Sequence, residues 1–183
     1  FTSWTEFRSD ASPLTWLVMV VACSEPLDQV TDAVRARDFS ALMALRDNPD
    51  EALACKAVQA VVWARGPELA PHHQALLTFQ RCPSKIRSEA AWALLEELDA
   101  EAAPGSLPAL TAALTDADEK VRWNVARVIG LLGVPSGRDG LKACQSDPNK
   151  FVAAWCVWSS CVLADGPDCR RPNMNLTNGK PAP

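Results

Sequence analysis

The sequence contains no tyrosine, and it has only eight glycines and two histidines among 183 residues. Long runs of β-branched residues are also rare, whereas alanine and leucine are frequent. This composition favours helices and argues against an all-β sandwich. The length suits one domain or a short array of repeats.

The chain has no excess of positive charge. Its formal net charge is −4 and its sequence pI is about 5.2. Because a surface that binds phosphates is usually basic, we expect no nucleic-acid partner, and a polybasic membrane-surface protein is equally excluded. A hydrophobic content of 48% with 22% charged residues is typical of an ordinary globular chain.

The residue patterns of common catalytic sites are missing. His72 and His73 are adjacent, and consecutive helical residues point about 100° apart, so the two rings cannot easily share one metal. The sequence has no glycine-rich phosphate loop and no Cys-x-x-Cys pair. We therefore expect no catalytic residue, metal or cofactor, and we predict a solvated or capping role for the two histidines.

An apolar segment near the start indicates a targeting signal rather than part of the folded domain. Residues 13–23 are too few to span a bilayer, which needs about 20 apolar residues, but they suit the apolar core of a secretory signal. The ending Val20-Val21-Ala22-Cys23 resembles a bacterial lipobox. That resemblance implies removal of residues 1–22, a lipid on Cys23 and a periplasm-facing place in the cell envelope. The alternatives are a buried N-terminal helix, with Pro13 in its first turn, and a cytoplasmic chain.

The body of the chain repeats. Polar turns centred on Pro49, Pro83, Asp118 and Pro148 are spaced by 34, 35 and 30 residues, a period typical of helical solenoids. Apolar residues at helical spacing flank every turn, so each unit is a short helix, a polar turn and a longer helix. Proline and Asp, Asn or Ser in these turns favour the start of the second helix.

The third unit shows the pattern best, with Asp116 in the turn, Val121-Arg122 and Ala126 in the second helix, and a glycine at the end. It resembles the HEAT repeat. The resemblance covers residues 38–164 and implies an all-α fold, an α-α superhelix (HEAT-like solenoid) of about four helix pairs. We expect residues 23–37 to be a tether and capping helix, and residues 165–183 a flexible tail.

The resemblance also implies a ladder between neighbouring repeats. In HEAT-like repeats a turn aspartate pairs with an arginine of the second helix. Asp47 and Asp116 match the aspartate, and Arg87 and Arg122 match the arginine. We interpret these four residues as structural, and the alternative is that they are simply solvated.

Seven cysteines are present, so six remain if Cys23 carries lipid, an even number that suits an oxidising periplasm. We expect Cys144 and Cys156 to be small apolar core residues. A bridge between Cys161 and Cys169 would attach the tail to the end of the solenoid.

Tryptophans concentrate on the second helices. We expect Trp63, Trp155 and Trp158 to fill the core. Trp123 falls outside the apolar stripe of its helix and cannot share that buried face. Second helices line the concave face in solenoids of this kind. We therefore predict a partner-binding patch there, the alternative being that the tryptophans cover gaps between repeats. The predicted patch comprises Trp92, Trp123, Glu89, Asn124 and Arg127.

These features predict a monomeric, non-catalytic scaffold that holds a protein or peptide partner on its concave face, with membrane contact through a lipid anchor only. Two alternatives stay open. One is a HEAT-like enzyme similar to bilin lyases or alkylpurine DNA glycosylases, and the other is a structural fragment of a longer repeat array.

Overall fold

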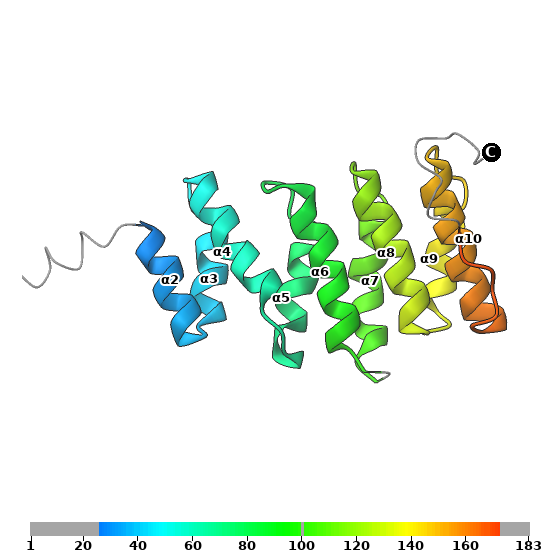
Figure 1. The fold of residues 1–183 in the computed structure, drawn as a ribbon, viewed down its shortest axis with the longest axis horizontal. Coiled ribbons are helices and arrows are strands. Elements are labelled where there is room, and N and C mark those ends of the chain that lie inside the picture. The colour runs from blue at the N-terminus through cyan, green and yellow to red at the C-terminus, as the bar shows by residue number, and fades with distance from the viewer. Residues whose placement is uncertain (1–25, 100, 173–183) are drawn as a thin grey trace, which may run out of the picture.

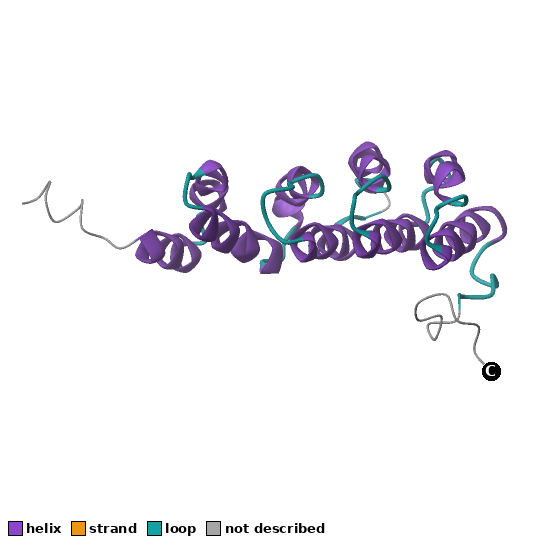
Figure 2. Ribbon diagram, turned by 90° about the horizontal axis from the view of Figure 1, so that it is seen from above, coloured by secondary structure: helices purple, strands orange, loops and turns teal. Residues whose placement is uncertain are grey.

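The structure is a computed structural model, and it describes residues 26–99 and 101–172. These residues form helices and no strand. The helices follow one another along a single long axis, from α2 at one end to α10 at the other (Figure 1). Seen from above, they lie in two rows (Figure 2). The predicted all-α solenoid is thus confirmed.

Four helix pairs follow one leading helix in the described part of the chain. The leading helix, α2, packs on α3 and α4. None of the described helices has the length and apolar character that crossing a membrane requires. In chain order the elements are α2 (Pro26–Ala36), α3 (Phe39–Ala44), the 3-10 helix η1 (Leu45–Asp47), α4 (Glu51–Trp63), the 3-10 helix η2 (Pro67–Leu69), α5 (Ala70–Leu76), α6 (Ser84–Glu97), α7 (Ala103–Ala113), α8 (Glu119–Leu132), α9 (Gly137–Cys144) and α10 (Lys150–Asp165).

The polar turns set where three of the four second helices begin. Asp50 accepts hydrogen bonds from the first backbone N–H groups of α4, Asp118 does so for α8, and Asn149 for α10. These side chains satisfy donors that have no partner inside a helix. Gly133 closes α8 in the left-handed conformation, with φ 71°, where an L side chain would be strained.

Stacking of the pairs buries a continuous core. The second helices α4, α6, α8 and α10 pack each on the next, and α5, α7 and α9 do the same. The largest fully buried side chains include Leu76, Leu94, Leu110, Ile129 and Leu141, which come from five different helices. Each pair therefore completes the apolar core of its neighbours, as expected of a repeat array.

Helices α8 and α10 approach each other closely at Gly130. A Cβ atom there would lie 2.6 Å from Oγ and 2.9 Å from Cα of Ser159. We therefore expect Gly130→Ala to lower the free energy of unfolding by about 1–3 kcal/mol, because overpacking must displace the α10 backbone. Urea denaturation followed by circular dichroism measures this.

Gly105 provides the matched control, since nothing lies within 4 Å of a Cβ built on it in α7. Gly105→Ala removes backbone freedom from the unfolded chain, so it should leave stability unchanged or raise it by up to about 1 kcal/mol. Equal stabilities for the two variants would contradict the close packing of α8 on α10.

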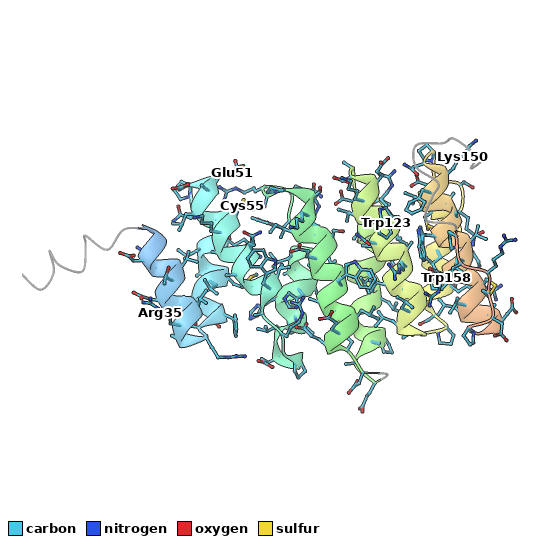
Figure 3. The ribbon with its side chains drawn as sticks, in the orientation of Figure 1. Arg35, Glu51, Cys55, Trp123, Lys150 and Trp158 are labelled. Carbon is cyan, nitrogen blue, oxygen red and sulfur yellow. A yellow bond between two sulfur atoms is a disulfide. The ribbon has the colours of Figure 1, made fainter. Side chains whose placement is uncertain are left out.

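Three disulfides tie the array together. Cys55 on α4 bonds to Cys82 in the turn before α6, with Cα atoms 5.5 Å apart, and Figure 3 shows Cys55 on the side of α4 that faces α6. Cys144 bonds to Cys156. Both residues lie in the core as predicted, but they do not act as separate small apolar side chains, because the packing of α9 on α10 sets the two buried positions opposite each other.

The third disulfide holds the segment after α10. Cys161 on α10 bonds to Cys169, and the indole Nε1 of Trp158 donates a 3.2 Å hydrogen bond to the carbonyl of Cys169. Residues 166–172, predicted as the start of a flexible tail, are thus attached to α10. Residues 173–183, the signal-like residues 1–22 and Cys23 lie outside the described residues.

Candidate functional site

Two arginine–aspartate pairs join neighbouring repeats. Arg87 on α6 binds Asp116 through two bonds, Nε to Oδ2 at 2.6 Å and Nη2 to Oδ1 at 3.0 Å. Arg122 on α8 binds Asp147 in the same way, at 2.7 and 3.1 Å. The Arg87 and Asp116 side chains are only 5% and 1% exposed, so this pair is part of the interior.

Burial alone would raise the pKa of Asp116, but hydrogen bonds from Arg87, from the backbone N–H of Asp118 and from Gln80 outweigh burial and lower it. The pKa of Asp147 is lowered for similar reasons, because the bonds from Arg122 and from the N–H of Asn149 outweigh burial. Both carboxylates are thus held ionised by structural partners.

The ladder differs from the predicted one at its aspartates. Asp47 is exposed and contacts only its neighbour Arg46 among the ion pairs of the described residues. In the structure, the repeats align on the residue that caps the start of each second helix. The ladder aspartate lies two residues before this cap. This position is Asn48 in the first unit and Asp147 in the fourth. Alignment on prolines shifted these two units by one residue, so Asp47 was assigned wrongly and Asp147 was missed.

Two tryptophans on second helices each bond to a polar side chain of the next second helix. Trp63 donates from Nε1 to Oε2 of Glu89 at 2.8 Å, and Trp92 donates from Nε1 to Oδ1 of Asn124 at 3.1 Å. The Arg127 guanidinium lies 4.7 Å from the Trp92 ring centroid. We call this set the tryptophan row; it comprises Trp63, Glu89, Trp92, Trp123, Asn124, Arg127 and Trp155.

The five patch residues predicted from sequence all lie in this row. Trp92, Asn124 and Arg127 contact one another directly. Trp123 joins them through Trp155, against which it stacks at 6.0 Å between centroids. Figure 3 places Trp123 on α8, towards the C-terminal end of the array. Glu89 contacts Trp63 and not these four residues in the described structure.

Asn124 has a different role from the predicted one. It is buried, and its amide bonds both Trp92 and the hydroxyl of Ser88. A side chain enclosed in this way cannot orient a partner directly. Asn124 instead fixes the position of the Trp92 ring.

Trp63 was predicted in the core, but its side chain is 60% exposed. The buried stripe of α4 includes Val58, Val61 and Val62, and Trp63 follows it at the last residue of the helix. Its position outside the buried stripe is the sequence signal that could have identified Trp63 as exposed. Trp155 and Trp158 are buried, at 2% and 5% exposure.

His73 is not the solvated or capping residue that we predicted. It is fully buried, with Nδ1 2.7 Å from Oε2 of Glu97 and Nε2 3.0 Å from the carbonyl oxygen of Val61. Both ring nitrogens therefore have a hydrogen-bond partner inside the protein. The position of His73 on α5 points the ring into the core. His73 thereby links α5 to Val61 of α4 and to Glu97 of α6.

One cluster in the described ranges has the residue types of a metal site. It consists of Cys161, Asp165 and Cys169. The two sulfurs are bonded to each other, so neither is available as a thiolate ligand.

Comparison with protein families agrees with this geometry. Residues 73–160 match the family model described as HEAT repeats. The matched segment extends from α5 into α10 and contains both arginine–aspartate pairs. No curated protein matches the chain. Residues 73–160 are thus similar to HEAT repeats, and the described residues form an all-α solenoid of HEAT-like helix pairs.

Proposed function

We propose that the protein is a non-catalytic module that binds a protein or peptide partner through the tryptophan row. HEAT repeats commonly serve as protein-interaction modules. The observation that supports this surface most is the placement of tryptophans on three successive second helices. Trp63 bonds to Glu89 of the next helix, and Trp92 and Trp123 are linked through Arg127 and Trp155. Tryptophan and arginine are the residues most enriched among binding hot spots.

The row is also held rigidly. Glu89 fixes the Trp63 indole and Asn124 fixes the Trp92 indole, each by a hydrogen bond. Side chains that are already ordered lose less conformational entropy on binding. The alternative of an enzyme is less well supported, since the His73 side chain is fully buried with both ring nitrogens bonded and lies out of a substrate's reach.

Alanine variants of the row test this proposal. Partners are cross-linked in the source cells, identified by mass spectrometry and titrated against the purified protein. We expect Trp63→Ala and Trp92→Ala each to weaken binding by about 2 kcal/mol or more, the size of a hot-spot contact. Trp63 is exposed, so its removal should leave the fold intact.

Val157→Ala is the matched control, because Val157 is an apolar side chain on α10, 53% exposed and outside the row. This variant should bind the partner normally. If Trp63→Ala and Trp92→Ala bind as tightly as the parent protein, the partner does not use the row.

We further propose that the protein is exported and anchored by lipid at Cys23. All six cysteines in the described residues pair into three disulfides, which leaves Cys23 at the lipobox-like ending. Disulfides form and persist in oxidising compartments such as the bacterial periplasm.

Intact-mass spectrometry of the protein from its source cells tests the anchor. We expect a chain that begins at Cys23, carries acyl groups and gives no free thiol on titration before reduction. A chain that retains residues 1–22, or that shows free thiols at the paired cysteines, would contradict export.

A further inference from the structure

Arg127 differs from the other arginines that are not exposed in the described residues. Arg46, Arg87 and Arg122 each pair with an aspartate. Arg127 has neither an ion pair nor a hydrogen bond there, and its guanidinium lies between two indole rings, 4.7 Å from Trp92 and 5.1 Å from Trp155. The aromatic faces stabilise the cation but leave its N–H donors without acceptors.

A second arginine lies beside this arrangement. Arg171 is exposed and lies 5.7 Å from the ring centroid of Trp158, which in turn meets Trp155 edge-to-face at 5.1 Å. Trp155 is buried, and its Nε1 has no acceptor in the described structure. We call these residues the arginine–tryptophan cluster; it comprises Trp92, Arg127, Trp155, Trp158 and Arg171.

The cluster has an electrostatic imbalance. Burial lowers the pKa of Arg127, and the positive charge of Arg171 lowers it further. An arginine nevertheless stays protonated in proteins. The Arg127 and Arg171 cations thus lie near each other in the arginine–tryptophan cluster. No carboxylate of the described residues forms an ion pair with either of them. Binding an anion between them would relieve both the repulsion and the unmet hydrogen bonding.

We propose that Arg127 and Arg171 form a binding site for a carboxylate group in an acidic segment of the protein partner. The inference rests on the proposed function, because Trp92, Arg127 and Trp155 belong to the tryptophan row as well. A planar guanidinium can hold a carboxylate by two parallel hydrogen bonds. The half-buried Trp92 ring provides an apolar wall for the methylene groups of a glutamate side chain.

A peptide-binding assay tests the site directly. Fluorescein-labelled hexaglutamate is titrated with the purified protein and followed by anisotropy, with hexaglutamine as the uncharged peptide. We expect the parent protein to bind hexaglutamate and not hexaglutamine. Arg127→Gln and Arg171→Gln should each weaken that binding about tenfold or more, because each removes charged hydrogen bonds.

Arg138→Gln is the matched control, since Arg138 is an exposed arginine on α9 outside the cluster. This variant should bind hexaglutamate as the parent does. Equal weakening by Arg138→Gln would overturn the proposal, because it would mean diffuse attraction to positive charge. Arg171 is exposed, so its variant stays informative even if Arg127→Gln unfolds.

Competition with inorganic phosphate is the second part of the peptide-binding assay. We expect it to displace hexaglutamate only at concentrations well above those of the peptide. Displacement at lower concentration than the peptide would overturn the choice of a carboxylate. Failure of the parent protein to bind hexaglutamate would overturn it as well.

The native partner separates this inference from the proposed function. If Trp63→Ala loses the partner while Arg127→Gln and Arg171→Gln keep it, the tryptophan row binds the partner and the carboxylate site is wrong. If Trp63→Ala and Trp92→Ala both keep the partner, the proposed function fails, whatever the peptide assay shows.

Discussion

Replacing Asp116 by alanine is expected to lower the free energy of unfolding by about 3–5 kcal/mol, as measured by urea denaturation. The substitution removes the anionic partner of Arg87, whose side chain is 5% exposed, and so leaves a charge buried without compensation. It also releases the hydrogen bonds that Asp116 accepts from Gln80 and from the backbone N–H of Asp118.

Asp47→Ala is the control, because the sequence pattern predicts the same ladder role for Asp47, yet that side chain is 71% exposed. It should cost less than about 1 kcal/mol, as is usual for a surface ion pair. The double variant Arg87→Met with Asp116→Leu should recover much of the loss, because it leaves no buried charge. Equal losses from Asp116→Ala and Asp47→Ala would contradict the structural ladder.

The pair of Arg87 and Asp116 should also affect how stability depends on pH. The pKa of Asp116 lies below its ordinary value of 3.8 in the folded protein. A carboxyl with a lowered folded pKa stabilises the fold fully above its unfolded pKa and loses this contribution as the pH falls through the folded value. Below about pH 4 the parent protein should therefore lose stability more steeply than Asp116→Ala.

Loss of the Cys55–Cys82 disulfide is expected to have the second largest effect. The bridge joins residues separated by 27 positions and connects α4 to the turn before α6. In the chain-entropy description, closing a loop of that length stabilises the fold by about 3–4 kcal/mol, because it restricts the unfolded chain. Cys55→Ala with Cys82→Ala should lose that amount in guanidinium denaturation.

The Cys161–Cys169 bridge provides the comparison, since it spans only 8 positions. Its removal by two alanines should cost about 2–3 kcal/mol on the same argument. A protein that unfolds at the same denaturant concentration with and without the Cys55–Cys82 bridge would contradict its structural role.

The solenoid could be predicted because its signals are local. The cap at Asp118 and the apolar stripe that starts at Val121 depend only on residues within a few turns. The register of the ladder depends instead on which residue caps each second helix. In the fourth unit this is Asn149 and not Pro148, and that shift of one residue concealed Asp147.

Contacts between distant residues were harder to predict. Trp63 meets Glu89 from 26 positions away, and His73 meets Glu97 from 24 positions away. Both contacts depend on how neighbouring helices cross, which the helical period does not specify. The same holds for Cys144 and Cys156, which face each other only once α9 is packed on α10.

The candidate site was partly predictable for the same reason. Helical periodicity placed Trp123 and Arg127 together on α8, off the buried stripe. It could not show that Asn124 is enclosed by Trp92 and Ser88. Arg171 was missed because it follows the last helix, where no periodic pattern remains.

Site-specific photocross-linking in the source cells tests the central claim most directly. A photoreactive phenylalanine derivative is placed at Lys85 on α6, which is 70% exposed and pairs with Glu89 of the tryptophan row, or at Lys142 on α9, which is 69% exposed and outside the row. Binding through the row predicts a discrete partner adduct from position 85 and none from position 142. An adduct from position 142 with none from position 85 would contradict it.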